Sequence, residues 1–333
     1  MPISLENRFK SFMKSVEFAE SIDDLLVGKQ YEGKQRADYL LFDRKVIVEL
    51  KNLAEDPSSK VEQEIDKHRD REDFPLIYGQ TDLQKVLKYL PDGKHINRRI
   101  HRNLTRSVEK GIRSADKQFV DTKAIFNLAD SISLLVVLNQ DIEIFSPEVV
   151  LSRLSQHLCS SSPSSPRVEN VDFVWFISES HVGVVPNIPN AFPSILLTSQ
   201  NSKQNKCFTS LFERLQHEWA RFNGLPLVQL DVASPSDISF RPARVEEPKT
   251  AAEIRRQDVW TRQYKMNPYL RHLPEEQVIV HGRQVFETLT PYFLKDGPRI
   301  PMEQLEPLLI SWNNFLQEAS HRGLDLRQML DEV

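Results

Sequence analysis

Apolar positions along the chain recur with two different periods, and each period predicts one kind of element. Continuous apolar runs predict buried strands at residues 132–138 and 171–178, and residues 194–198 are predicted as an extension of the second run or an edge strand. Apolar residues at every third or fourth position predict helices at residues 5–22, 94–123, 147–158 and 208–222. Weaker patterns predict helices from residue 58 or 59 to 68 and at 76–90, and a strand at 225–230. This alternation predicts an α/β sheet covered by helices.

The pattern changes after residue 231, which predicts a second domain. Residues 232–250 are rich in proline, serine and charge and are typical of a linker. Helical periodicity follows at residues 251–264, 275–293 and 302–322. A chain of 333 residues is long enough for about two domains. We therefore expect an α/β domain at 1–231 and a helical domain at 251–333, which would serve dimerisation, partner docking or DNA contact.

Residues 36–52 contain two apolar runs around a short polar turn, and this pattern predicts a β-hairpin. If Asp43 and Arg44 form a two-residue loop, Leu40 pairs with Ile47. This register fixes which side chains face each other along the whole hairpin.

The predicted register brings three ionisable side chains to one end of the hairpin. Asp38 falls opposite Glu49, and directly opposed Cβ atoms in an antiparallel pair lie roughly 5 Å apart. Lys51 lies two residues after Glu49 and therefore shares its face of the strand. Two ionised carboxylates ~4 Å apart repel by about 4 kcal/mol at an effective dielectric constant of ~20. This repulsion requires a compensating positive charge or a proton.

Three arrangements satisfy that requirement. One acid can take up a proton, or Lys51 can form a surface salt bridge with Asp38 and Glu49. A divalent cation is the better fit, because Mg²⁺ prefers carboxylate and carbonyl oxygens together with water. Lys51 could then orient a water molecule or stabilise charge on a reacting phosphoryl group. This combination is typical of phosphodiester hydrolysis.

The spacing Asp38, ten residues, Glu49-Leu50-Lys51 resembles the D…(D/E)xK signature of the PD-(D/E)XK, or restriction-endonuclease-like, nucleases. The resemblance implies a mixed sheet flanked by helices. It also implies Mg²⁺ (or Mn²⁺) bound by Asp38, Glu49 and the Leu50 carbonyl, with Lys51 as the catalytic lysine. Ala37 stands where the family pattern has a proline.

The same resemblance implies accessory residues from neighbouring helices. Family members usually add an acid from the helix before the hairpin, and Glu6 fits this role ahead of Glu20. A solvated charge is the alternative for each. Gln63 and Gln118 match glutamines that relatives use near the metal, although a surface glutamine is the alternative for Gln63.

The predicted helix at 94–123 carries a basic stripe opposite its apolar stripe. Its cations recur every three or four residues at Arg99, Arg102, Arg106, Lys110, Arg113 and Lys117. Phosphate contact would make nucleic-acid binding depend strongly on salt, whereas the alternative is an ordinary solvated face.

Composition limits the class of protein. No apolar run approaches the ~18 residues that a membrane span needs, so we expect no membrane association and a cytoplasmic location. Two cysteines without metal-ligand spacing argue against a disulfide framework or a zinc site. The net charge of −4 does not by itself favour nucleic acid, so the local basic stripe matters more.

Together these features predict a Mg²⁺-dependent phosphodiesterase that cleaves nucleic acid, with DNA favoured over RNA. A homodimer or an activating protein partner is expected, and fold analogy alone suggests a role in defence or repair. The alternative is a non-catalytic module that keeps the nuclease fold and binds nucleic acid or protein.

Overall fold

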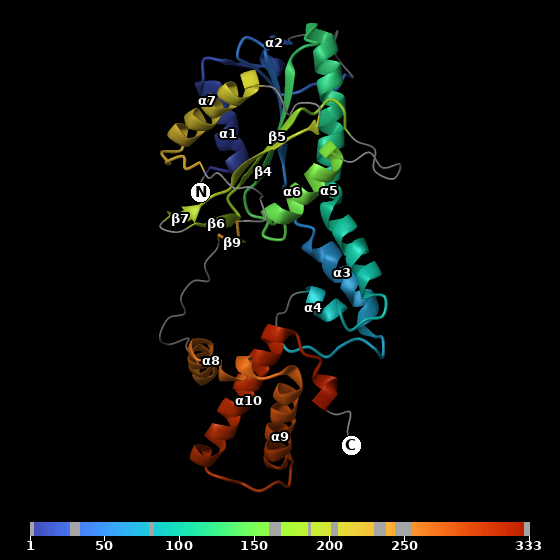
Figure 1. The fold of residues 1–333 in the computed structure, drawn as a ribbon, viewed down its shortest axis with the longest axis vertical. Helices are drawn as coiled ribbons and strands as arrows, with labels where there is room; N and C mark the ends of the chain where they lie inside the picture. Colours follow the sequence, from blue (N-terminus) through green and yellow to red (C-terminus); the bar gives the residue numbers. More distant parts are fainter. Residues whose placement is uncertain are drawn as a thin grey trace. The chain divides into compact units, whose positions relative to one another are not determined.

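The chain forms two compact units, each with its own core (Figure 1). The first consists of Met1–Lys60 and Asn103–Val245, and the second of Val61–Arg102 and Glu246–Val333. The computed structural model describes residues 3–26, 34–79, 83–159, 168–185, 188–200, 206–229, 238–243 and 255–329.

This division differs from the linear one expected from the sequence. Residues 61–102 belong with the C-terminal helices and not with the sheet. Most of the expected linker at 232–250 lies outside the described residues, although Phe240–Pro242 within it form a short strand, β9.

A six-stranded mixed sheet forms the centre of the first unit, in the order β1-β2-β3-β4-β5-β8. The first three strands pair antiparallel, β3, β4 and β5 pair parallel, and β8 runs antiparallel to β5. The strands span Ala19–Ser21 (β1), Tyr39–Leu41 (β2), Val46–Asn52 (β3), Ile132–Asn139 (β4), Phe173–Ser178 (β5) and Ser194–Thr198 (β8). The three apolar runs predicted as strands are thus confirmed as β4, β5 and β8.

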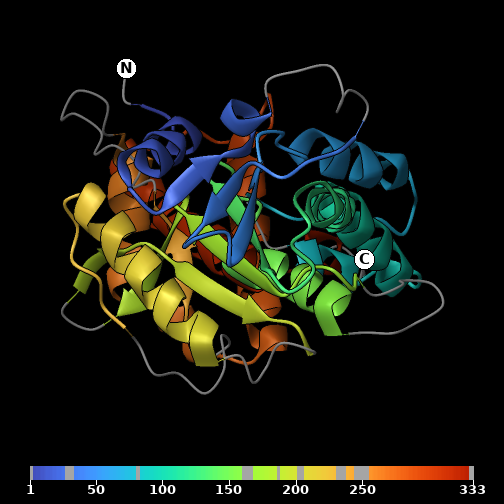
Figure 2. The ribbon, with the colours of Figure 1, turned by 90° about the horizontal axis from the view of Figure 1, so that it is seen from above.

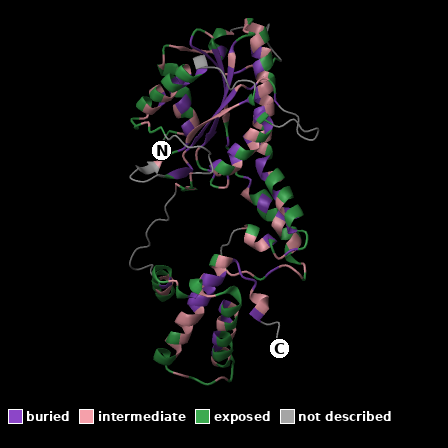
Figure 3. Cartoon of the chain, in the orientation of Figure 1, coloured by how far each residue is buried: buried purple, intermediate pink, exposed green. Residues whose placement is uncertain are grey.

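Two pairs of helices cover the two faces of this sheet (Figure 1, Figure 2). On one face, Phe9 of α1 packs edge-on against Trp175 of β5. On the other, Ile112 and Phe119 of α5 share a fully buried cluster with Ile47 of β3. The helices span Leu5–Ser15 (α1), Gly93–Phe126 (α5), Pro147–Cys159 (α6) and Lys206–Phe222 (α7). The strands between these layers are mostly buried, as Figure 3 shows.

The hairpin of β2 and β3 has the predicted register, with Leu40 paired to Ile47. Its turn residues Asp43 and Arg44 have φ of 54° and 66°, the left-handed values that a tight type I′ connection requires. Phe42 is also left-handed, with φ of 53°, and its ring stacks on Phe18. The polar turn therefore fixes the pairing, as the sequence indicated.

The first predicted helix is shorter than expected and ends at Ser15 instead of continuing to Ile22. Val16 has an extended backbone, and Ala19 then pairs with Leu41 as the edge strand β1. A short helix, α2, follows at Ile22–Leu25. The strand pairing overrides the helical periodicity because it completes the antiparallel edge of the sheet.

Two weaker predictions are also wrong in part. Among the described residues of the segment predicted as a helix at 76–90, the α-helical ones are Leu83–Leu87, which form α4. Residues 225–229 form no strand, and the side chains of Leu225 and Val228 are about half exposed. A three-stranded sheet that the sequence did not predict joins β7, β6 and β9. Its first two members in the chain are β6, His181–Val185, and β7, Ile188–Ala191.

The second unit is helical, and its C-terminal helices confirm the periodicity read from the sequence. Its buried centre is formed by Tyr264, Val278 and Phe315, and Tyr78 packs against it from the earlier segment. The elements are α3 (Ser58–Arg69, which begins in the first unit), α4, α8 (Arg256–Met266), α9 (Glu275–Phe293), α10 (Met302–Arg322) and the 3₁₀ turns Tyr269–His272 and Leu326–Met329.

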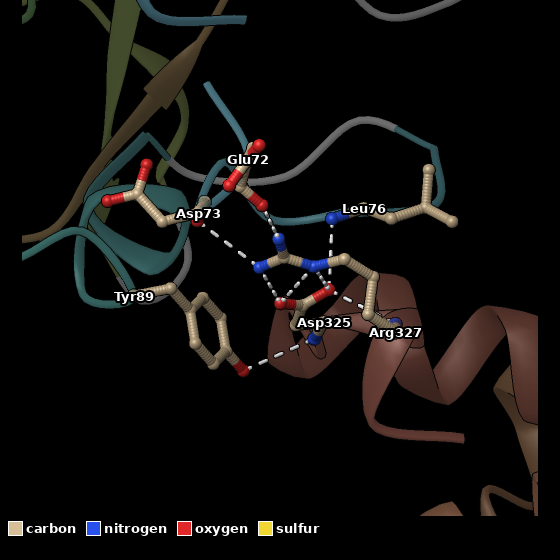
Figure 4. Close-up of polar contacts among 6 residues, drawn as sticks. All are labelled: Glu72, Asp73, Leu76, Tyr89, Asp325 and Arg327. Carbon is tan, nitrogen blue, oxygen red and sulfur yellow. Dashed lines mark hydrogen bonds and ion pairs between the residues drawn. The ribbon is translucent and has the colours of Figure 1, made fainter. Parts of the chain in front are cut away.

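A polar network explains why residues 61–102 belong to this unit (Figure 4). Asp325 accepts a hydrogen bond from the Leu76 N–H over 2.9 Å. Arg327 binds Asp325 and donates to the carbonyls of Glu72 and Asp73 over 2.6 and 3.2 Å. The chain terminus thereby supplies partners for backbone groups some 250 residues earlier, a pairing that no local pattern predicts.

Candidate active site

The structure brings Asp38 and Glu49 together from adjacent strands. Asp38 directly precedes β2, and its N–H donates to the Val48 carbonyl over 3.0 Å. Glu49 follows Val48 in β3. Asp38 therefore lies opposite Glu49 in the hairpin register, and the two carboxyls are close enough to influence each other's pKa. The expected convergence of the two acids is therefore observed.

The pKa values of both acids are raised. Burial raises the pKa of Glu49 to about 7, and the charge of Asp38 adds to this rise, while Lys51 and Gln118 oppose it. Burial also raises the pKa of Asp38, against a hydrogen bond of 2.7 Å from the Leu50 N–H. Two neighbouring carboxylates, one of them buried, repel each other when both are ionised, so a cation or a proton between them stabilises the site.

Lys51 supplies one positive charge to this pair. Its Nζ lies 2.5 Å from Glu49 Oε1 and donates to Gln118 Oε1 over 2.9 Å. Glu49 is only 2% exposed, and its second oxygen, Oε2, receives no hydrogen bond from any N–H or O–H of the described residues. An acceptor buried without a donor costs about 1–3 kcal/mol. The site thus has an unmet requirement for a cation or a proton at Glu49 Oε2.

The donor set fits Mg²⁺ or Mn²⁺ better than a softer metal. Two carboxylates supply hard oxygen ligands, and Mg²⁺ commonly takes one or two protein carboxylates and fills its other positions with water and substrate. Within the described residues, no group of three or more His, Cys, Asp or Glu side chains forms a metal site. The Leu50 carbonyl remains a predicted ligand.

Glu6 and Glu20 have other partners. Glu6 of α1 pairs with Lys10 over 2.5 Å and accepts from Asn52 Nδ2 over 3.0 Å. Asn52 alternates with Lys51 along β3, so its side chain leaves the opposite face of the strand. Glu20 lies in β1 and pairs with Arg44 at the hairpin turn over 2.9 Å.

Of the two predicted glutamines, Gln118 reaches the site, where it accepts a hydrogen bond from Lys51 and lowers the pKa of Glu49. Gln63 is an exposed residue of α3 in the second unit. Ser114 donates to Gln118 Oε1 over 3.1 Å. A Cβ added to Gly111 would lie 3.8 Å from Lys51 Cγ. Small and polar residues at 111, 114 and 118 therefore form the face of α5 that packs on Lys51. Their spacing of three and four residues marks one face of the helix, but the apolar stripe was the stronger pattern in the sequence.

The predicted basic stripe on α5 is partly neutralised by acids. Arg99 pairs with the buried Glu64 over 2.6 Å, and Arg113 pairs with Glu109 over 3.1 Å. The remaining cations of the stripe form no ion pair with another described residue: Arg102, Arg106, Lys110 and Lys117. The last three belong to the same unit as Asp38 and Glu49.

Comparisons with known proteins do not place the chain in a family. No family model matches it, and neither a curated protein nor a solved structure matches it significantly. Nor does any helix within the described ranges have the length and apolar character to cross a membrane.

Proposed function

We propose that the protein is a Mg²⁺-dependent nuclease of the PD-(D/E)XK type. The observation that carries the proposal is the pairing of Asp38 with Glu49 across the β2–β3 hairpin, with the Lys51 amine 2.5 Å from Glu49. The buried, undonated Oε2 of Glu49 supports a cation at the same point. The mixed sheet with helices on both faces agrees with the fold that this family resemblance implies.

Asp38 and Glu49 would hold the metal, and Lys51 would act beside it. A bound Mg²⁺ would supply Lewis-acid chemistry, lowering the pKa of water and offsetting negative charge on a phosphoryl group. Lys51 brings three N–H donors, of which Glu49 and Gln118 engage two. The third is available for a phosphate oxygen or the attacking water. Glu49 has a pKa of about 7, so proton exchange at this carboxyl would occur near neutral pH.

Nucleic acid is the proposed substrate because α5, the helix that packs over Lys51, carries three cations: Arg106, Lys110 and Lys117. None of the three forms an ion pair with another described residue. Such cations suit the phosphate backbone. The preference for DNA over RNA, and a role in defence or repair, extend this proposal by fold analogy.

Substitution at Lys51 and Asp38 tests the proposal. Purified protein is incubated with plasmid, linear and single-stranded DNA and with RNA, in Mg²⁺ and in Mn²⁺. Lys51→Ala should abolish cleavage but keep a metal-dependent rise in melting temperature, whereas Asp38→Asn should lose both. Lys45→Ala, which removes an exposed lysine of the same hairpin, is the control and should cleave normally. Wild-type protein that cleaves nothing and shows no metal-dependent rise contradicts the proposal.

One observation favours the non-catalytic alternative. The Lys51–Glu49 ion pair offsets one of the two negative charges without any metal. A binding module predicts salt-sensitive DNA affinity that neither Lys51→Ala nor Asp38→Asn changes, together with no metal-dependent rise in melting temperature.

A further inference from the structure

Helix α5 holds the two residues that precede Asp38 in the chain. The Ala37 N–H donates a hydrogen bond to Thr122 Oγ1 over 2.8 Å, and Gln118 Nε2 donates to the Arg36 carbonyl over 2.9 Å. Gln118 and Thr122 are four residues apart and therefore lie on one face of the helix. These bonds join the entrance of β2 to side chains 85 and 82 residues away in sequence.

The bond to Thr122 is a buried one. The Thr122 side chain is fully buried and Ala37 is 2% exposed. A buried N–H without an acceptor destabilises the fold, so the Thr122 hydroxyl allows this segment to pack against α5. A third bond, from the Gln35 N–H to Asp121 Oδ2 over 3.2 Å, extends the contact by one residue at the surface.

Gln118 connects this segment to the site directly. Its Nε2 binds the Arg36 carbonyl, while its Oε1 accepts from Lys51 Nζ over 2.9 Å. One amide group therefore fixes the Lys51 amine relative to the backbone that carries Asp38.

We propose that Thr122 is a positioning residue, which sets the Asp38 carboxyl against Glu49 and Lys51 by holding Ala37 on α5. The catalytic consequence rests on the proposed nuclease function. The positioning itself is a property of the protein without metal.

Ala37 explains why this chain needs such a hold. The family pattern that the site resembles has a proline here, and proline has a fixed φ and no N–H. Ala37 has no ring that fixes its φ, and it carries an N–H, which donates to Thr122 Oγ1. A tertiary hydrogen bond thus supplies the restriction that a proline ring would give.

Three substitutions test this role. Thr122→Val keeps the volume of the side chain but cannot accept the Ala37 N–H, whereas Thr122→Ser restores the hydroxyl. Ser131→Ala is the matched control, because Ser131 Oγ donates to the Arg44 carbonyl over 2.6 Å at the other end of the same hairpin. The measurements are amide exchange by NMR, Mn²⁺ affinity, and kcat and KM for DNA cleavage, with melting temperature as the check on folding.

We expect Thr122→Val to speed amide exchange at Ala37 and Asp38 and to lower Mn²⁺ affinity and kcat by about tenfold or more, with little change in KM. Thr122→Ser should recover most of the loss, and Ser131→Ala should match wild type at a similar melting temperature. The proposal is overturned if Thr122→Val keeps wild-type Mn²⁺ affinity and kcat. It is also overturned if Ser131→Ala lowers both quantities as much as Thr122→Val does. If wild-type protein neither binds Mn²⁺ nor cleaves, the nuclease function fails. Amide exchange then decides the positioning alone, and unchanged exchange at Ala37 and Asp38 overturns it.

Discussion

At the scale of single residues, Glu49 combines near-complete burial with an oxygen atom that receives no hydrogen bond from the described residues. An ionised carboxylate in that position is unstable unless a cation joins it, and the Lys51 amine reaches only the other oxygen. Asp38 adds a second acid at the same point. The three residues are therefore balanced between a protonated state and a state with a bound cation.

This balance predicts a specific pH dependence. The pKa of Glu49 rises from the ordinary 4.5 to about 7 in the folded protein, so folding favours the protonated form. The resulting stabilisation is complete below pH 4.5 and is lost as the pH rises through about 7. Its size is roughly 3 kcal/mol, because a difference of one in pKa corresponds to about 1.4 kcal/mol. Melting temperatures of the metal-free protein between pH 5 and 8 should therefore fall more steeply for wild type than for Glu49→Gln.

Mn²⁺ provides the check on that prediction, since a metal binds the ionised carboxylates. Adding Mn²⁺ should raise the melting temperature of wild type more at pH 8 than at pH 5.5. Glu49→Gln should lose most of this difference. Parallel pH curves for the two proteins without metal would contradict the assignment of the titration to Glu49.

At the scale of elements, the hairpin could be predicted from sequence but its supports could not. The turn at Asp43 and Arg44 fixes the register locally, and the register alone brings Asp38 opposite Glu49. Gln118 was predicted by resemblance, but its bond to the Arg36 carbonyl spans 82 residues and has no local signal. Thr122 was missed for the same reason.

Two helical glycines predict opposite outcomes of the same substitution. A Cβ at Gly111 of α5 meets Lys51 Cγ at 3.8 Å, an ordinary contact, so Gly111→Ala should stabilise the helix by about 0.5–1 kcal/mol. A Cβ at Gly282 of α9 would lie 2.3 Å from Phe315 Cε2 in the core of the second unit, so Gly282→Ala should cost roughly 1–3 kcal/mol. Denaturant titration of both variants measures the difference. A destabilised Gly111→Ala would show that α5 packs more closely on Lys51.

The basic stripe of α5 yields a third prediction, because only part of it is paired. Replacing Arg106, Lys110 and Lys117 by Gln should lower DNA affinity and reduce the slope of log K against log salt by about 0.7–0.9 for each phosphate that the variant no longer binds. Arg113→Gln is the control, because Glu109 already engages this cation. Fluorescence anisotropy over a range of salt concentrations measures the slope. An unchanged slope in the triple variant would identify the stripe as a solvated face.

At the scale of the whole molecule, the chain passes through its second unit twice. A linear division at residue 231 was the natural prediction, because composition and periodicity change there. The observed division depends on Asp325 and Arg327, which bind backbone groups near Leu76. Sequence periodicity reports which face of an element is buried, but not which distant segment buries it.

Asp325 is therefore expected to govern the stability of the second unit. Its side chain is 6% exposed and joins the Leu76 N–H to the Arg327 guanidinium. Asp325→Ala should cost roughly 2–4 kcal/mol, because it removes the acceptor of the Leu76 N–H and the carboxylate partner of the Arg327 guanidinium. Hydrogen exchange should increase at residues 72–76 and leave the β2–β3 hairpin unchanged. Equal changes in both places would contradict an independent second unit.

The double passage of the chain has a practical consequence for work with fragments. A clone that stops at residue 245 would appear to remove one domain at a natural border, but it would separate Leu76 and Tyr78 from the groups that bind them. A fragment limited to the first unit would leave out residues 61–102 as well as 246–333. Insertions, tags and proteolytic trimming should be planned by those three borders, not by the single one that the composition suggests.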